Sequence, residues 1–378
     1  MLTRRDLRIK AFQAVYAYKQ RVKSNVGLAI NTIDDYFAPD LNSLQAQDHQ
    51  LLKKKAEVAK ALFEETRVNP DALKKEDDAA ILESINIAQD FLAKRNLVEK
   101  EEIKKLIQKD LLKVEEAFIS ALKFIEELST INAKKEGEWI PNNLANNSFI
   151  KVLKESNQFQ SLVAKYSINW NDEEQLPRFV YLEKLLHLEV IEEMNKQVET
   201  TSQFDFKVLK KLLKKGLFKV EAVNTVFDEK DTYWVDNEDI VEKNIARLIR
   251  TYQSEGLKLN LLEGEHWEED QAFFNQLFDY GTEFGSEVEQ VYLSNLKNRD
   301  REKLTDSDDV IVTLALNEMA HFSSIPLKVT MNEYIDIAKT YSTPKSNIFV
   351  NGLIDSTAKV LQEKGLIKKS GRGLLDNQ

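Results

Sequence analysis

The sequence predicts an all-α fold in which long helices are joined by short connections. Only 11 glycines and 6 prolines occur in 378 residues, whereas sheets need frequent turns built from these residue types. From Ile103 to Ile125 apolar residues recur every three or four positions, which places them on one stripe of a helix. No G-x-G-x-x-G sequence follows a strand-like run. At this length we expect two or three domains, since one domain takes about 100 to 200 residues.

The composition narrows the class of protein. The chain is acidic, with a formal charge of -10, and it contains no cysteine. The missing cysteine excludes disulfides, thiol nucleophiles and cysteine-ligated zinc, and it agrees with a reducing compartment. No stretch reaches the roughly 18 uncharged apolar residues of a membrane span. The basic N-terminal stretch is interrupted by Asp6, Lys10 and Lys19, unlike a targeting peptide. We therefore expect a cytoplasmic protein.

The sequence offers no catalytic constellation. Its four histidines are far apart, and none belongs to a His-x-x-x-His or His-Glu-x-x-His pattern. It has no Walker loop, no G-x-S-x-G elbow and no kinase-type glycine-rich loop. We therefore expect neither enzymatic activity nor a bound metal or cofactor, which leaves binding as the expected activity.

Three tryptophans predict helix starts. Trp170, Trp234 and Trp267 each precede a cluster of acids, and acids favour the positive end of a helix dipole. An apolar residue before the cap also packs against the first turn. The alternative is that these rings stack on a nucleotide or sugar. The segment 138–149, with Pro141 and several asparagines, predicts a loop between helical blocks.

The first helix is strongly basic. Residues 1–23 carry seven Lys or Arg against one Asp, and Thr3 is placed to cap the helix. At about 100° per residue, three arginines share one third of the circumference, and the apolar residues mark another face. We expect the apolar face to dock and the guanidiniums to point outward toward phosphates, a role suited to arginine. These arginines are Arg4, Arg5 and Arg8. The alternative is a solvated face that pairs with acids elsewhere in the chain.

The C-terminal region predicts two helices that meet at a short loop. A capping box, Thr330-x-x-Glu333, predicts the start of the first helix, which runs to about Tyr341 and is broken before Pro344. Ser346 is placed to cap the second helix. Tyr341 and Phe349 then lie near each other. If exposed, the two rings could stack on unpaired RNA bases; if buried, they belong to the core.

Both ends of the sequence resemble the NusB family of transcription antitermination proteins. The stretch RRDLRIKAFQAVY resembles the arginine-rich first helix of that family, and residues 326–355 follow its C-terminal signature without a gap. The matching C-terminal positions are Pro326, Val329, Asn332, Glu333, Ala338, Lys339, Phe349, Asn351, Gly352 and Asp355. The resemblance covers residues 1–24 and 256–378, which leaves a long middle part as a helical insertion.

The resemblance implies an all-helical protein of small bundles that is not an enzyme. It implies binding of boxA-type ribosomal RNA together with the ribosomal protein NusE, in contact with the RNA polymerase elongation complex. By position, it assigns RNA contacts to Arg4, Arg5, Arg8, Tyr341 and Phe349, and NusE contacts to Tyr16 and Asp308. The implied organisation is a basic helix (1–24), the rest of the N-terminal bundle with the insertion (25–255), and a C-terminal bundle (256–378).

The sequence departs from the family pattern at three positions. Thr313 stands where an arginine is usual and Asn317 where a tyrosine is common, so the helix over 308–321 is expected to pack differently. Lys345 stands where shorter members often carry an acid. We expect this cation to add to the RNA site, with stronger phosphate attraction and less dependence on NusE.

The insertion contains one further basic stretch, residues 206–219, with six lysines on an amphipathic pattern. It either extends the RNA contact or is a solvated face. The alternative function for the whole protein is a ribosome-assembly or protein-interaction scaffold with weak or no RNA binding. RNA methyltransferases with a NusB-like domain are excluded because their catalysis needs cysteine.

Overall fold

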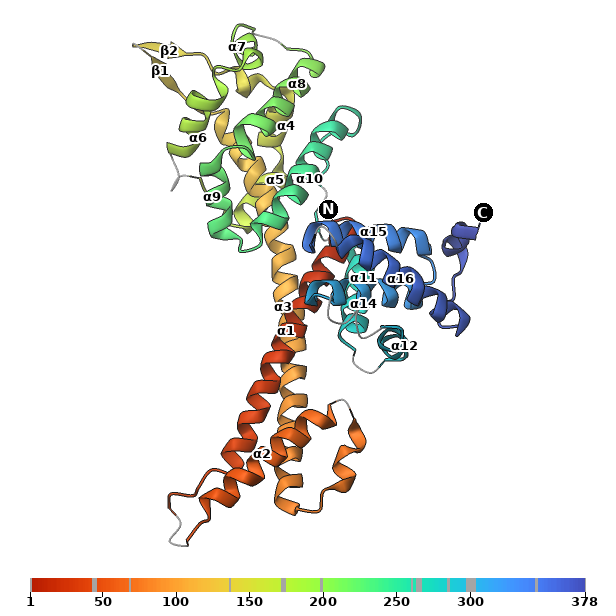
Figure 1. Ribbon diagram of the computed structural model, residues 1–378. Coiled ribbons are helices and arrows are strands. Elements are labelled where there is room, and N and C mark those ends of the chain that lie inside the picture. The colour runs from red at the N-terminus through yellow and green to blue at the C-terminus, as the bar shows by residue number, and fades with distance from the viewer. Residues whose placement is uncertain are drawn as a thin grey trace. The chain divides into compact units, whose positions relative to one another are not determined.

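The computed structural model describes most of the chain (Figure 1). The described residues are 2–42, 46–67, 69–135, 137–170, 175–197, 200–259, 261–262, 267–283, 286–296, 304–343 and 346–377. Over these residues the protein is almost entirely helical, which confirms the predicted fold class. The sheet found in them is one antiparallel hairpin of β1 (Ala133–Lys135) and β2 (Glu138–Ile140), with Lys134 opposite Trp139. None of the described helices is long and apolar enough to cross a membrane.

The chain divides into two compact units. Unit 1 comprises Met1–Asp6 and Gln108–Asp270, and unit 2 comprises Leu7–Ile107 and Gln271–Gln378. Two long helices, α1 (Arg4–Tyr36) and α3 (Ala79–Leu128), contribute residues to both units. The boundaries of these units differ from those of the predicted segments 1–24, 25–255 and 256–378, because the segments follow motif positions and the units follow packing.

Unit 2 contains a helical bundle around a buried central helix, α14 (Asp306–His321). Every residue from Val310 to Met319 is buried, because neighbouring helices cover this helix on several sides. The helices of this part, besides the later part of α11 (Trp267–Thr282), are α12 (Glu287–Asn295), α15 (Leu327–Tyr341), α16 (Ser346–Glu363) and the short η5 (Gly371–Asn377). α14, α15 and α16 pack on one another, and α12 packs on α14 and α16.

A second core in unit 2 joins three helical segments. The later part of α1 packs with α2 (His49–Thr66) and with the beginning of α3, and η1 (Pro70–Lys75) lies between these last two in sequence. Small residues Ala29 and Ala59 and the large Phe63 are fully buried between them. Burial of these apolar side chains stabilises this core by about 25 cal/mol per Å² of apolar surface removed from water.

Unit 1 is built on the later part of α3. Around it lie short helices and turns: η2 (Asn143–Asn146), α4 (Ser148–Glu155), α5 (Asn157–Lys165), α6 (Gln175–Phe179), η3 (Val180–Leu185), α7 (Glu189–Asn195), α8 (Ser202–Leu212), η4 (Leu213–Leu217), α9 (Glu221–Lys230) and α10 (Trp234–Glu255). The segment predicted as a loop at 138–149 instead holds β2, η2 and the start of α4.

The tryptophan prediction is confirmed at two of its three positions. α10 begins at Trp234 and α11 (Trp267–Thr282) at Trp267. After Trp170, residues 171–174 lie outside the described residues, and α6 begins at Gln175. Trp170 and Trp234 are each 2% exposed and pack on Phe227, with ring centroids 5.8 and 4.4 Å away. These two rings therefore belong to the core of unit 1.

Candidate nucleic-acid interface

The first turn of α1 is capped as predicted. Thr3 Oγ1 accepts a hydrogen bond from the Asp6 amide at 3.2 Å, and the Asp6 carboxylate accepts one from the Thr3 amide at 2.8 Å. This reciprocal pair satisfies two backbone donors at the helix start. Within unit 1, Arg4 lies 3.5 Å from Asp270, whereas the side chain of Arg5 is exposed. Both arginines keep solvent-accessible surface at the helix start.

Arg8 does not point outward, so the predicted orientation is wrong for this residue. It is 4% exposed and lies inside unit 2. Its Nε and Nη2 atoms donate to the two carboxylate oxygens of Glu318 on α14, at 2.7 and 2.8 Å. The guanidinium also lies 5.5 Å from the ring of Phe273. Because helices from the C-terminal part cover this side of α1, the arginine is enclosed with a carboxylate and cannot reach an RNA phosphate.

Glu318 is the centre of a buried polar cluster. Besides the two bonds from Arg8, it accepts hydrogen bonds from Thr330 Oγ1 at 2.7 Å and from the Tyr334 hydroxyl at 3.3 Å. Burial lowers the pKa of Arg8, but the hydrogen bond and charge of Glu318 more than offset this, so the pKa is raised. Burial and the same carboxylate raise the pKa of Tyr334. The cluster therefore holds one charged pair and a neutral tyrosine.

Thr330 is not the helix cap that the sequence predicts. α15 begins earlier, at Leu327, with Pro326 as the preceding residue. Thr330 is completely buried, and its hydroxyl donates a hydrogen bond to Glu318. Because the helix has already begun at Leu327, the capping-box pattern has no free helix terminus to act on.

Two lysines connect α1 to the first half of α14. Lys19 Nζ lies 2.7 Å from an Asp309 oxygen and donates to Thr313 Oγ1 at 3.4 Å. Lys23 pairs with Asp306, and hydrogen bonds from Lys23 and Gln20 lower the pKa of Asp306. Thus the position where the family usually has arginine, Thr313, receives a cation from α1 instead.

An aromatic row lies along α1 on the side of α15. The ring centroids of Phe12 and Tyr341 are 5.1 Å apart, and those of Phe12 and Tyr16 are 6.2 Å apart. Tyr16 is 38% exposed, Tyr341 and Phe349 are half-buried, and Phe12 is buried against Tyr16 and Tyr341. The structure therefore brings Tyr341 to the N-terminal helix and leaves part of its ring accessible. Lys345 lies outside the described residues.

Asp308 is not available to a partner protein. It is fully buried at the start of α14, where it forms a capping box with Thr305. Its other carboxylate oxygen accepts a hydrogen bond from Ser342 Oγ. Both oxygens stabilise the helix start and the end of α15, and the NusE contact near this residue stays a prediction.

The sequence reasoning missed Glu318, Phe12, Lys19 and Asp309. Glu318 was detectable as an acid inside the long apolar run of residues 310–320, since an isolated charge in such a run needs a buried partner. Phe12 lies one helical turn from both Arg8 and Tyr16 on α1, so helical spacing already placed it between them. No sequence signal paired Lys19 with Asp309.

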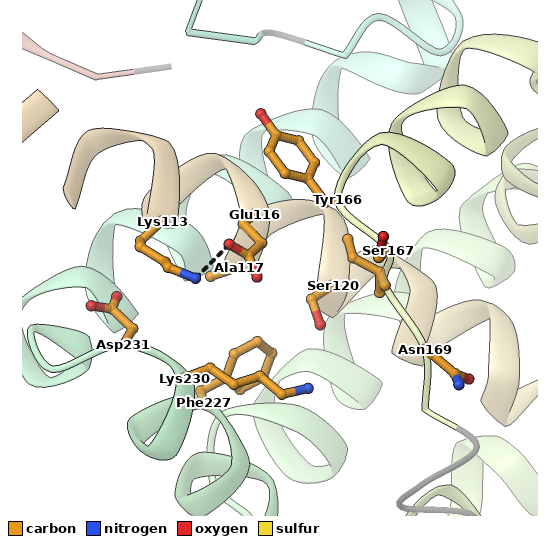
Figure 2. A pocket seen from close by; sticks show the side chains of 11 residues that line it. Lys113, Glu116, Ala117, Ser120, Tyr166, Ser167, Asn169, Phe227, Lys230 and Asp231 are labelled. Atoms are coloured by element: carbon orange, nitrogen blue, oxygen red, sulfur yellow. Dashed lines mark hydrogen bonds and ion pairs between the residues drawn. The ribbon is translucent and has the colours of Figure 1, made fainter. Parts of the chain in front are cut away.

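Unit 1 contains a separate cavity of about 270 Å³ (Figure 2). Lys113 and Glu116 from α3 form an ion pair at 2.7 Å. Phe227 and Lys230 also line the cavity. The Asp231 carboxylate accepts hydrogen bonds from Asn237 and from the Tyr233 amide. Two lysines and two carboxylates therefore give the lining no net formal charge.

Comparison with known proteins identifies a matching family model and several relatives. The model of the NusB family matches residues 233–359. A protein named transcription antitermination protein NusB from Chloroherpeton thalassium is 48% identical over 69 residues, which is 18% of this chain and 33% of the relative. Proteins of the same name from Salinibacter ruber and Dictyoglomus thermophilum are 34% and 31% identical over 103 and 106 residues.

The extent of these matches differs among the relatives. The match covers 27% of this chain and 64% of the Salinibacter ruber protein, and 28% of this chain and 72% of the Dictyoglomus thermophilum protein. The chain therefore spans one third and slightly less than two thirds of the first two relatives. No solved structure matches the chain.

Proposed function

The chain belongs to the NusB family, and we propose that it is an RNA-binding transcription antitermination factor and not an enzyme. The proposed ligand is a boxA-type ribosomal RNA leader, bound together with the ribosomal protein NusE in the RNA polymerase elongation complex. The proposed location is the cytoplasm. No cofactor or metal takes part in this function.

The observation that carries the proposal is the pairing of the two motif-bearing regions in unit 2. Arg8 and Phe12 belong to the basic first helix, while Glu318 and Tyr341 belong to the C-terminal bundle. The bidentate ion pair and the ring contact at 5.1 Å join these regions. These buried contacts therefore hold together two regions that are far apart in the sequence, and such support is what a preorganised binding site needs.

The proposed RNA contacts fall into two kinds. Arg4 and Arg5 at the start of α1 bind phosphates, because a guanidinium fork and the positive end of a helix dipole both suit an oxyanion. Tyr341 and Phe349 offer ring surface to unpaired bases, a contact worth about 1 to 3 kcal/mol per base. Lys345 is proposed as a further phosphate contact from its sequence position. Arg8 supports the surface from inside and touches no RNA.

Tyr16 is the proposed contact for NusE. Its exposed ring rests on Phe12, which fixes the ring at low entropic cost, and exposed tyrosines are frequent anchors of protein interfaces. Asp308 contributes only by holding the start of α14. The neighbouring Asp309 is partly exposed and pairs with Lys19, so it offers an acidic group beside the same helix.

A scaffold function is the second candidate. It is favoured by the large part of unit 1, residues 108–232, that lies outside the segment matched by the family model. In that reading unit 1 binds a ribosomal or other protein, and RNA binding is weak or absent.

The test is binding of a boxA RNA and of a scrambled RNA of the same length, with and without NusE, over a salt series. We expect a preference for boxA and a log–log salt slope of about -2 to -4, from three to five phosphate contacts on a single strand. Tyr16→Ala should keep binding to RNA alone and lose the gain that NusE gives. No boxA binding even with NusE would overturn the proposal and favour the scaffold.

A further inference from the structure

Five lysines form an exposed stripe in unit 1, on α8 and the π-helical turn η4. The stripe consists of Lys207, Lys210, Lys211, Lys214 and Lys215, and all five are exposed. Their spacing of three and four residues places them on one face of the helical segment. The stripe lies outside residues 233–359, so the match to the family model does not account for it.

The opposite face anchors the stripe. Val208, Leu212 and Leu217 are fully buried in the core of unit 1. At Gly216 an added Cβ would lie only 2.6 Å from a Leu185 methyl, so η4 packs closely against η3. Thr201 Oγ1 caps the start of α8. The five ammonium groups are therefore carried by a backbone fixed by packing, and not by a mobile tail.

The stripe has little compensating negative charge. The nearest carboxylate within ion-pair distance is that of Glu193, 3.9 Å from Lys207. Among the described residues the other four lysines have neither an ion pair nor a hydrogen bond from their side chains. Asp205, at the start of α8, is buried and accepts hydrogen bonds from Ser148 and Thr200. Like charges one turn apart repel each other, and a polyanion along the stripe removes this repulsion.

The chemistry of the stripe favours a nucleic acid over a protein. Protein interfaces are depleted in lysine at their centre and rely on aromatic or apolar anchors, and no large apolar side chain of the segment 207–215 is exposed. Phosphate backbones are held by lysine and arginine without reading the bases. Successive turns also space the cations by about 5.4 Å along the helix, which suits contact with consecutive backbone charges.

We propose that the lysine stripe binds the phosphate backbone of RNA without sequence preference, as a contact additional to the proposed boxA site. The choice of RNA as the polyanion rests on the proposed function, whereas the need for a polyanion rests on the stripe alone. Lys219 is left out of the stripe because it lies near the carboxylate of Glu238, whose pKa it lowers against the stronger effect of burial.

The experiment compares the full chain with a variant in which Lys210, Lys211, Lys214 and Lys215 are all changed to Gln. A matched control changes four exposed lysines of unit 2 to Gln and so alters the net charge equally; these are Lys53, Lys54, Lys94 and Lys105. Binding to a long oligouridine is measured by fluorescence anisotropy over a salt series. Circular dichroism checks that both variants keep their helical content.

We expect the stripe variant to bind oligouridine at least about tenfold more weakly at low salt, with a log–log salt slope shallower by about 2 to 3, at about 0.7 per lost contact. The control should keep the wild-type slope. Equal slopes for the stripe variant and the wild type would overturn the proposal, and an acidic protein would then be the remaining partner.

A second measurement separates this proposal from the proposed function. The ratio of affinities for boxA and scrambled RNA should be the same in the wild type and the stripe variant, because the stripe reads no bases. If boxA is not preferred at all, but the slope on oligouridine still changes, the proposed function fails and the stripe stands. If boxA is preferred and the slope does not change, the reverse holds.

Discussion

Arg8 on α1 and Glu318 on α14 form a buried bidentate ion pair across 310 positions of sequence, with N···O distances of 2.7 and 2.8 Å. The pair is the internal connection between the basic first helix and the C-terminal bundle. Thr330 and Tyr334 supply further hydrogen bonds to the same carboxylate. An arginine that sequence spacing assigns to RNA therefore works in the interior, where it fixes the surface that carries Tyr16 and Tyr341.

Arg8→Ala should lower the free energy of unfolding by about 3 to 5 kcal/mol, because it leaves the Glu318 carboxylate buried without its cation. Urea unfolding followed by circular dichroism measures this. Lys359→Ala is the control: Lys359 pairs with Asp355 at 2.7 Å on α16, where both side chains are exposed, and such pairs contribute about 0 to 1 kcal/mol. A loss for Arg8→Ala no larger than that of the control would contradict the structural role of the pair.

Gly281→Ala should destabilise unit 2 by about 1 to 3 kcal/mol through overpacking. A Cβ at Gly281 would lie 2.7 Å from Leu314 on α14 and 2.9 Å from Val15 on α1, so α11 approaches both helices only without a side chain. Gly352→Ala in α16 is the matched control, since nothing lies within 4 Å of its added Cβ. It should stabilise by up to about 1 kcal/mol from helix propensity. Thermal unfolding of both variants tests the contrast, and a stabilised Gly281→Ala would refute the close packing.

His321 should make stability depend on pH below about neutral. Its ring is stacked on Tyr280 with centroids 3.8 Å apart, and burial lowers its pKa below 6.5, with Glu283 opposing this in part. Since the folded state favours the neutral ring, the unfolded state binds the proton at higher pH. Stability is therefore full above about pH 6.5 and falls as the pH drops from there to the folded-state pKa. His321→Phe keeps a stacked ring and should flatten this part of the profile; an unchanged profile would rule out His321 as its source.

Arg5→Gln should weaken boxA binding and make the log–log salt slope shallower by about 0.7, the value for one phosphate contact on a single strand. Its side chain is exposed in the first turn of α1. Arg250→Gln is the control, because Arg250 is exposed on α10 and carries the same charge. Fluorescence anisotropy over a salt series distinguishes the two variants, and equal slopes would remove Arg5 from the RNA contact.

Local signals were sufficient for several features. The Thr3 cap with Asp6, the helix starts at Trp234 and Trp267, and the end of α15 near Tyr341 all follow from interactions within one turn of the chain. These caps and breaks depend on neighbouring residues, so the local sequence is enough to place them. The apolar repeat between Ile103 and Ile125 likewise marks a buried stripe of α3.

Long-range packing decided the features that local signals misplaced. Arg8, Thr330 and Asp308 are all polar and all buried, with partners on other helices or at helix ends distant in sequence. A helix pattern shows which residues share a face, but not whether another element covers that face. Their burial is favourable only because each polar group meets its partner, and that meeting exists only in the folded chain.

The sequence by itself determined an all-helical protein, the basic character of its first helix, and a resemblance carried by both ends of the chain. Only the tertiary structure decided which of the basic and aromatic residues remain accessible. It turned Arg8 inward to Glu318, left Arg5 and Tyr16 exposed, and placed Tyr341 on Phe12. The physical reason is that helix formation is set by neighbours along the chain, whereas exposure is set by which distant segments cover each face.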